Sequence, residues 1–578
     1  MIFSHRLFEG SSPTVFLQAS AAAILCTLPW LNPFSFGPVP SNPPWLFTAF
    51  AAALAVLASA PLAQRRAPTL GPWWCLCGAL ALLVLALWPR EAVLAPYEVL
   101  ALVGALVLIG LGAALARRLP PACAVGGLPW GLWCALLPWI LAGLVSSVLA
   151  LVQYFGHAGL LTPWVNWAPA GEAFANLRQR NQFASLTSIA LAALLALWVL
   201  GGQGSRRLSR GQGAWLAAAV ALLVAGNAAS ASRTGLLQLV LLAGLGLLWC
   251  RERRALGWLG GMLAGYALAV VLLPWAAGLD PAGHGMFARL RDGDALCSSR
   301  LTLWRNVLQL IGMRPWLGWG WGELDYAHYM TLYEGPRFCD ILDNAHSLPL
   351  HLAVELGIPA AALVGVGVLV WILRARPWRE TDALRRAAWM VVAVLGAHSL
   401  LEYPLWYGPF QLALGLCLGL LWRERAAVAV AAPQQSMRHV PLLSVALAVV
   451  VLGLAGYAAW DYRGITQIYL PPAQRAPAYR DDTLAKLQHS WLYRRQLQFA
   501  VLGMAEVSPD DAARVHALAT TLLHFSPEPR VVEKLLDSAR LLGLQDDVRL
   551  HEARFAAAFP EAYARWRAAQ PADPSADP

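Results

Sequence analysis

The chain has 578 residues, of which 58% are hydrophobic and 13% are charged, and its mean hydropathy is +0.53. A soluble protein carries about twice that fraction of charged residues, so the composition excludes an ordinary soluble enzyme and indicates a polytopic membrane protein. The net charge of +10 does not indicate nucleic-acid binding, because 41 of the 43 basic residues are Arg and no Arg run alternates with aromatic residues.

Charge-free stretches long enough to cross a bilayer recur along the chain. A helix needs about 20 apolar residues to cross a hydrocarbon core of roughly 30 Å. The sequence therefore predicts an all-α polytopic membrane protein with about 13 transmembrane helices. In chain order the predicted spans lie near 14–31, 44–63, 71–88, 97–116, 129–155, 182–201, 213–231, 234–250, 255–276, 346–373, 387–402, 408–422 and 441–460.

The short loops between these spans alternate between Arg-rich and Arg-poor. The Arg-rich set, counted with Arg6, holds 19 Arg, whereas the opposite set holds Arg90, Arg178, Arg180 and Arg233. By the positive-inside rule the N-terminus is predicted to be cytoplasmic, and an odd number of spans places the C-terminus in the periplasm. The first span lacks a cleavage site after a short apolar core, so we expect it to be retained.

Two hydrophilic regions divide the predicted organisation. Residues 1–170 are expected to form N-terminal transmembrane helices, 171–425 a catalytic core with an outer loop at 277–345, and 426–460 the last transmembrane helix. The periplasmic tail, 461–578, mixes charged and apolar residues at helical spacing and predicts helical hairpins. A tetratricopeptide-like array is one option for it, although no repeat period is clear, and residues 571–578 are expected to be disordered.

Cys297 and Cys339 are the two cysteines of the predicted outer loop. In an oxidising compartment they would form a disulfide, and the alternative is two free thiols. Cys75 and Cys77 lack the spacing of metal ligands and are expected in a helix core.

Arg residues on the outer side run against the positive-inside rule, so we expect each of them to have a specific role. Arg178, Gln179, Arg180 and Asn181 lead into the sixth span, where they could bind a phosphate and a sugar, or the Arg side chains could extend to lipid headgroups. Arg233 lies in a very short turn between two spans, where a cation is costly unless it meets a carboxylate or a bound anion.

The outer loop and the span that follows it supply another cation and a histidine. Arg300 begins a predicted amphipathic helix with Trp304 as an interfacial anchor, and it is either a ligand or part of a polar face. Ser347 is a predicted N-cap that follows Asn344 and His346. A helix N-terminus favours anions and a neutral imidazole, which suits a general base, although a lone interfacial His is often structural.

Polar and aromatic residues end the eleventh span. His398 and Glu402 are four residues apart, so they lie on one helix face and can pair. A zinc site would need a third ligand that the sequence does not place. Tyr403 and Tyr407 belong to an aromatic cluster that could be a membrane-interface belt or a platform for sugar stacking.

Several of these segments, in this order, resemble the O-antigen ligase and polymerase superfamily. The resemblance rests on 176–184, Ser232-Arg233-Thr234-Gly235, Arg300 with the turn at 314–320, and 344–347 with 355–358. Residues 398–407 and the long tail resemble a narrower branch, the bacterial O-linked protein oligosaccharyltransferases that glycosylate pilins and other periplasmic proteins. Arg180 departs from the pattern, because many relatives have Pro there.

The resemblance implies a glycan donor on undecaprenyl pyrophosphate and a Ser or Thr hydroxyl as acceptor. It implies that His346 accepts the proton or orients the hydroxyl, that Arg233 and Arg300 bind the pyrophosphate, and that Gln179 and Tyr403 or Tyr407 hold sugar or acceptor. Pyrophosphate is a good leaving group, so the chemistry requires neither a metal nor a cofactor.

Four rival functions remain to be weighed. An O-antigen ligase performs the same chemistry on lipid A–core sugar, but such ligases generally end soon after the last span, and a polymerase is a weaker rival for the same reason. A glycolipid transporter would need ionisable groups at mid-membrane or paired broken helices, whereas the polar residues here gather at one face. A non-catalytic scaffold would not need an outward cluster of Arg and His.

Overall fold

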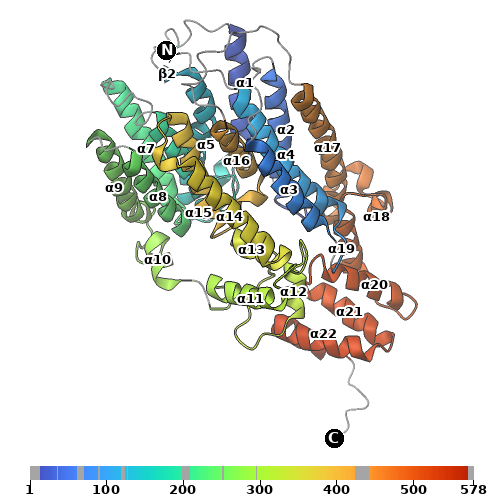
Figure 1. Ribbon diagram of the computed structural model, residues 1–578. Coiled ribbons are helices and arrows are strands. Elements are labelled where there is room, and N and C mark those ends of the chain that lie inside the picture. The colour runs from blue at the N-terminus through green and yellow to red at the C-terminus, as the bar shows by residue number, and fades with distance from the viewer. Residues whose placement is uncertain are drawn as a thin grey trace. The chain divides into compact units, whose positions relative to one another are not determined.

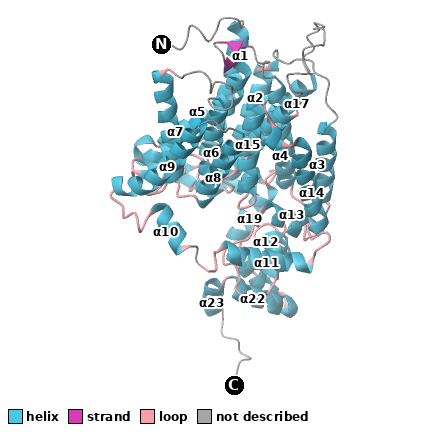
Figure 2. Ribbon diagram, turned by 60° about the vertical axis from the view of Figure 1, so that its left-hand side comes forward, coloured by secondary structure: helices cyan, strands magenta, loops and turns pink. Residues whose placement is uncertain are grey.

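The computed structural model describes residues 13–34, 37–60, 71–88, 91–118, 124–125, 128–197, 209–249, 253–293, 296–422 and 442–570. Helices joined by loops make up these residues, as Figure 2 shows, and the strands among them are limited to a two-residue antiparallel pairing of β1 (Ala124–Val125) with β2 (Leu128–Pro129). The predicted disorder at 571–578 and much of the Arg-rich set, including 61–70, 201–208 and 423–441, lie outside the described residues.

Every predicted apolar segment contains helix. The helices are α1 (Pro13–Leu31), α2 (Asn42–Ala58), α3 (Gly71–Leu87), α4 (Pro96–Arg118), α5 (Trp130–Tyr154), α6 (Arg180–Leu195), α7 (Arg210–Ala229), α8 (Arg233–Trp249), α9 (Arg253–Ala276), α13 (Leu348–Leu356), α14 (Ile358–Ala375), α15 (Ala383–Ser399), α16 (Gly408–Leu421) and α17 (Leu442–Thr466). The predicted span 346–373 was wrong in one respect, because it is two helices, α13 and α14, that meet at Gly357.

Six helical stretches among the described residues are long and apolar enough to cross a membrane. They are Pro96–Arg118, Ala135–Tyr154, Arg210–Ala229, Leu256–Ala276, Ile358–Arg379 and Ser444–Tyr469. Together with five shorter apolar helices they support a helical, multi-pass membrane protein. The count of 13 spans and the sides of the two termini stay predictions.

The chain forms two compact units. The first comprises Met1–Gly78, Val103–Gly293 and Leu369–Ala459, and the second comprises Ala79–Leu102, Asp294–Val368 and Trp460–Pro578. In the first unit α6 is buried over nearly its whole length and packs against α5, α7, α8 and α15. Small residues permit this packing: a Cβ atom on Gly235 would lie 2.7 Å from the Cβ of Ala184, so α8 and α6 approach closely only because Gly235 has no side chain.

The second unit contains the rest of the outer loop and the C-terminal helices. The loop forms α11 (Arg300–Met313) and α12 (Leu324–Met330), while α10 (Gly285–Asp292) belongs to the first unit. The tail forms α18 (Thr483–Leu487), α19 (Arg494–Met504), α20 (Ala512–Leu523), α21 (Pro529–Leu541), α22 (Gln545–Ala558) and α23 (Pro560–Ala568), in agreement with the predicted hairpins. Figure 1 shows α20, α21 and α22 packed side by side, and their aliphatic residues share a core with Tyr329, Phe499, Phe555 and Trp566 from α12, α19, α22 and α23.

Candidate functional site

The segment that leads into α6 is held by bonds within the first unit. Gln179 is the N-cap of α6, and its side chain accepts the backbone N–H of Gln182 at 2.6 Å. The guanidinium of Arg178 donates to Oδ1 of Asn166 at 3.1 Å, and that of Arg180 pairs with Glu172 at 2.5 Å. Phosphate binding by Arg178 and Arg180 stays a prediction, and for Arg180 it would require release of Glu172.

Asn181 and Glu402, which the sequence predicts as substrate-binding residues, bond to each other. Nδ2 of Asn181 donates to Oε1 of Glu402 at 3.0 Å, although 221 residues separate them in the chain. His398 is fully buried, and its Nδ1 lies 2.8 Å from Oγ of Ser185, one turn further along α6. Hydrogen bonds between α6 and the end of α15 therefore engage both His398 and Glu402.

Arg233 is the first residue of α8 and is exposed. The preceding Ser232 caps this helix, because its Oγ accepts the backbone N–H of Gly235 at 3.0 Å. Ala231 has a φ of 49°, a left-handed conformation that an alanine adopts at a cost, so the turn between α7 and α8 needs its capping bonds. The backbone position from which the Arg233 side chain extends is therefore fixed by the start of α8.

The aromatic cluster after Glu402 belongs to the same unit. The rings of Tyr403 and Tyr407 are stacked, with centroids 6.1 Å apart and planes 21° from parallel, and both side chains are half-buried. Stacked phenol rings offer apolar faces and hydroxyl groups, which suits contact with a sugar or with headgroups. Contact with a sugar and contact with headgroups both stay predictions.

His346 lies in the turn before α13 in the second unit, outside the helices long enough to span a membrane. Its φ is 49°, and its backbone N–H donates to Oδ1 of Asn344 at 2.9 Å, which forms an Asx turn. Nδ2 of Asn344 is buried and makes no hydrogen bond with any described residue. A buried donor without a partner is uncommon, and substrate binding by Asn344 stays a prediction.

Arg300 starts α11, whose N-cap Ser299 accepts the backbone N–H of Thr302 at 3.2 Å. One turn later, Trp304 donates its indole N–H to the carbonyl oxygen of Ala345 at 3.1 Å. The predicted interfacial anchor therefore ties α11 to the turn that carries His346, because a partly buried indole N–H requires an acceptor. Anchoring of Trp304 in headgroups stays a prediction.

The imidazole of His346 is kept neutral by its surroundings. Burial has the largest effect and, together with the positive charge of Arg300 and the proximity of His351, lowers the pKa of His346 from its ordinary value of 6.5 to about 4. A neutral imidazole with a guanidinium close enough to influence it can accept a proton while the cation binds an anion.

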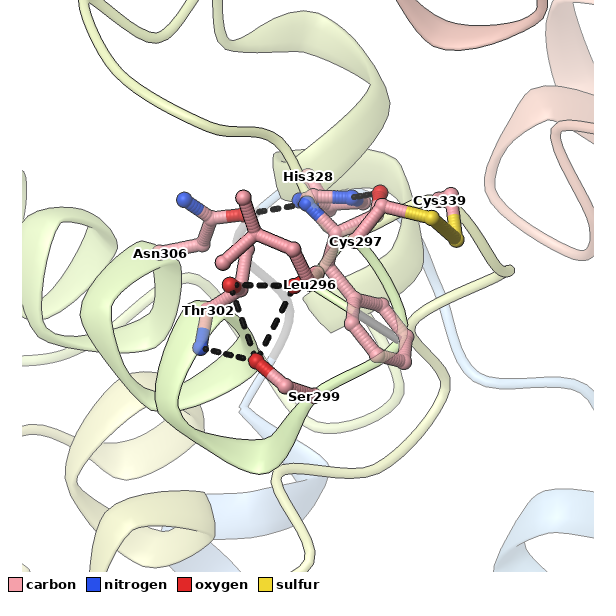
Figure 3. Close-up of a disulfide and its surroundings, with 8 residues drawn as sticks. Leu296, Cys297, Ser299, Thr302, Asn306, His328 and Cys339 are labelled. Atoms are coloured by element: carbon pink, nitrogen blue, oxygen red, sulfur yellow. Dashed lines mark hydrogen bonds between the residues drawn. A yellow bond between two sulfur atoms is a disulfide. The ribbon is translucent and has the colours of Figure 1, made fainter. Parts of the chain in front are cut away.

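Cys297 and Cys339 form a disulfide, with their Cα atoms 5.3 Å apart (Figure 3). The backbone N–H of Cys339 also donates to the carbonyl oxygen of Cys297 at 3.2 Å. Asn306 of α11 reinforces this join, since its Oδ1 accepts the N–H of Phe338 at 2.8 Å. The start of α11, with Arg300, is thus bound to the segment that leads to His346.

The glycine-rich turn that follows α11 docks on the end of α13 through its backbone. Trp319 N–H donates to Val354 O at 2.9 Å, and Ile358 N–H donates to Pro315 O at 2.8 Å. Gly318 and Gly357 have φ values of 69° and 91°. These bonds hold the turn against α13, and they also fix the helix break that follows His346.

Two members of the buried polar network, Ser185 and Gln238, were missed by sequence reasoning. Nε2 of Gln238 donates to Oγ of Ser185 at 2.7 Å, and both side chains are fully buried. The signal was present, because Asn181 and Ser185 have the same four-residue spacing as His398 and Glu402. Among the residues that the structure describes, no three His, Cys, Asp or Glu side chains are grouped so that they could hold a metal ion.

Three known families match parts of the chain. The family described as O-Antigen ligase matches residues 217–365, a range that holds Arg233, Arg300 and His346. The family described as Protein glycosylation ligase matches residues 173–198, which hold the segment that starts α6. The family described as Virulence factor membrane-bound polymerase, C-terminal, matches residues 386–573, so the long tail is no argument against a polymerase.

Two curated proteins of Acinetobacter baylyi are similar to the chain. A general O-oligosaccharyltransferase is 29% identical over 200 residues, which are 32% of this chain and 34% of that protein. A ComP-specific O-oligosaccharyltransferase is 24% identical over 254 residues, which are 43% of this chain and 44% of that protein. The chain therefore spans less than half the length of the curated relatives it matches.

Proposed function

We propose that this chain, a member of the O-antigen ligase superfamily, is a protein O-oligosaccharyltransferase. It moves a preassembled oligosaccharide en bloc from undecaprenyl pyrophosphate to Ser or Thr hydroxyls of periplasmic proteins such as pilins. The activity in the names of both relatives supports this assignment, as does the glycosylation-ligase match over the start of α6.

The observation that carries the proposal is that His346 and Arg300 belong to one unit, where the positive charge of the guanidinium helps to lower the pKa of the imidazole. A hydroxyl acceptor needs a group that takes or orients its proton, and a pyrophosphate leaving group needs a cation. The low pKa of His346 keeps the base form present at neutral pH even with Arg300 nearby.

The transfer forms one bond and breaks another. The acceptor oxygen attacks the anomeric carbon of the first sugar, its proton passes to the imidazole of His346, and the carbon–oxygen bond to the pyrophosphate breaks. The electron pair of that bond leaves with undecaprenyl pyrophosphate, whose negative charge Arg300 stabilises, and Arg233 of the first unit is assigned to pyrophosphate binding because the family resemblance implies that role. A water or the leaving group then removes the proton from His346.

Other residues would hold the substrates. The free Nδ2 donor of Asn344 suits a hydroxyl or phosphate oxygen near His346. Gln179, Tyr403 and Tyr407 are assigned to sugar or acceptor contact, and Arg178 and Arg180 to a secondary phosphate contact once their present partners are displaced. For Asn181, Glu402 and His398 the observed bonds favour a supporting role in place of direct contact.

The cellular setting is part of the same proposal. The chain lies in the bacterial inner membrane with its N-terminus in the cytoplasm and about 13 spans, and the site and the tail face the periplasm. The disulfide between Cys297 and Cys339 fits an oxidising compartment.

One alternative is favoured by a specific observation. The polymerase match over residues 386–573 includes the end of α15 and the tail, and a polymerase would use a sugar hydroxyl of a second lipid-linked repeat as acceptor. A ligase onto lipid A–core would use a core sugar. Both use the same donor chemistry, so the acceptor decides among the three.

Co-expression of the full chain with a lipid-linked glycan and a pilin-like protein tests the proposal. We expect the intact mass of the acceptor protein to rise by the mass of the glycan only when the chain is present. Glycan found solely on lipid A–core, or solely as longer lipid-linked chains, would replace the proposed activity with that of a ligase or a polymerase.

A further inference from the structure

Two hydrogen-bonded chains join α15, α6 and α8 in the first unit. In the first chain Asn181 donates to Glu402 at 3.0 Å and accepts the hydroxyl of Ser232 at 2.5 Å. In the second, Ser185 lies 2.8 Å from Nδ1 of His398 and accepts Nε2 of Gln238 at 2.7 Å. Because Asn181 and Ser185 are one helical turn apart, α6 is the middle member of both chains.

The chemistry of the first chain fixes its direction. A carboxylate can only accept, so the amide nitrogen of Asn181 must face Glu402 and its oxygen must face Ser232. The Ser232 hydroxyl must then donate to Asn181, which leaves its oxygen free to accept the backbone N–H of Gly235 at 3.0 Å. The side chains of Glu402 and Ser232 are buried, so water competes little with these bonds.

The first chain ends one residue before Arg233. Ser232 follows Ala231, whose left-handed backbone is costly, and it precedes the helix start that carries the guanidinium. A long side chain binds an anion more tightly when its backbone is already fixed, because less conformational freedom is lost on binding.

We propose that Glu402, Asn181 and Ser232 are positioning residues that set the direction of Arg233 toward the pyrophosphate of the donor. The inference rests on the proposed function, since it assigns Arg233 to that group. The three residues act through the α8 cap, and the inference replaces the direct substrate contact predicted for Asn181 and Glu402.

The second chain is a matched control within the same three helices. Gln238 lies five residues after Arg233, and its bonds join the same helices through the same kinds of groups. Loss of either hydrogen-bonded chain leaves buried polar atoms unpaired and lowers the melting temperature. Only loss of the first hydrogen-bonded chain should weaken the binding of pyrophosphate.

The test uses the full chain in detergent with a lipid-linked glycan donor and an acceptor protein. We compare Ser232→Ala, Ser232→Thr and Ser185→Ala, and we measure the donor KM, kcat, inhibition by inorganic pyrophosphate and the melting temperature. Ser232→Ala removes the bond to Asn181 and the cap bond from Gly235, and it should raise the donor KM and the pyrophosphate inhibition constant about fivefold at nearly constant kcat. Ser232→Thr keeps the hydroxyl and should stay within about twofold of wild type.

Ser185→Ala should lower the melting temperature while both constants stay at their wild-type values. Equal changes of KM in Ser232→Ala and Ser185→Ala would overturn the inference and leave the proposed function standing. Absence of transfer by the wild-type chain would overturn both. If Ser232→Ala does not fold, Asn181→Ala serves instead: it removes the side chain that joins Glu402 to Ser232, and an unchanged pyrophosphate inhibition constant would contradict the inference.

Discussion

The backbone N–H of His346 donates to Oδ1 of Asn344 at 2.9 Å, while the φ of His346 is 49°. A side chain with a Cβ atom adopts this left-handed conformation at a cost of roughly 1–2 kcal/mol. The Asx turn offsets that cost locally, and the direction of the imidazole therefore depends on Asn344. In the proposed mechanism a displaced imidazole cannot reach the acceptor hydroxyl.

Removal of the Asn344 side chain should therefore reduce transfer without unfolding the protein. We expect Asn344→Ala to lower kcat about 100-fold, because small misplacements of a reacting group cost that much. Asn344→Ser retains an oxygen that can accept the N–H of His346 and should lose less. Single-turnover rates with both variants measure this, and equal rates for the two would contradict the role of the turn.

The pH dependence of transfer should reflect the low pKa of His346. The base form is lost only as the pH approaches about 4, so kcat/KM should be level between pH 5.5 and 8, provided that the donor does not titrate there. A base with the ordinary pKa of 6.5 would be half protonated at pH 6.5, and kcat/KM would fall to half its maximum there. An acidic limb centred near 6.5 in the rate profile would contradict the assigned environment.

The same shift predicts a pH-dependent stability. Because the folded pKa lies below the unfolded value, the unfolded chain binds more protons between pH 4 and 6.5, and stability falls as pH is lowered through that window. His346 accounts for up to about 3 kcal/mol of this loss. Burial also lowers the pKa of His551 to about 4, so the measurement is the difference between wild type and His346→Gln across this range.

Close backbone packing at Gly357 gives a prediction on folding. A Cβ atom there would overlap the carbonyl oxygen of Trp316, and the φ of 91° is unfavourable for other residues. We expect Gly357→Ala to lower the free energy of unfolding by at least about 2 kcal/mol. Gly312→Ala in α11 is the matched control: no neighbouring atom lies within 4 Å of its Cβ, and it should be neutral or slightly stabilising.

The disulfide of the outer loop should contribute mainly to stability. Cys297 and Cys339 are 42 residues apart, and closure of a loop of that length is worth about 4 kcal/mol in the chain-entropy account. The double variant Cys297→Ser, Cys339→Ser should melt at a lower temperature and lose its sensitivity to reducing agent. If the melting temperature of the wild-type protein did not change on reduction, this would contradict the stabilising role of the disulfide.

The helices were predictable from the sequence, and the partners of the polar residues were not. Apolar stretches located every membrane-length segment, because hydrophobicity is a local property, but the break at Gly357 depends on the turn around Trp316 that packs against it. The motifs around Arg233, Arg300 and His346 were enough to show a resemblance to the O-antigen ligase superfamily, and the family matches over residues 217–365 and 173–198 agree with it.

The bond between Asn181 and Glu402 spans 221 residues, and no local pattern reveals it. The same holds for Trp304, which the sequence suggests as a membrane anchor and the structure shows bonded to Ala345. Long-range pairing of this kind follows from the packing of helices, and one-dimensional spacing can only suggest it.

The most direct test of the account is the intact mass of a pilin-like acceptor co-expressed with wild-type chain, His346→Ala or the control His284→Ala. His284 is an exposed histidine in the 277–345 loop region. The account predicts glycan on the acceptor with wild type and with His284→Ala, and none with His346→Ala at equal amounts of membrane-inserted protein. Glycosylation at the wild-type rate by His346→Ala would contradict it.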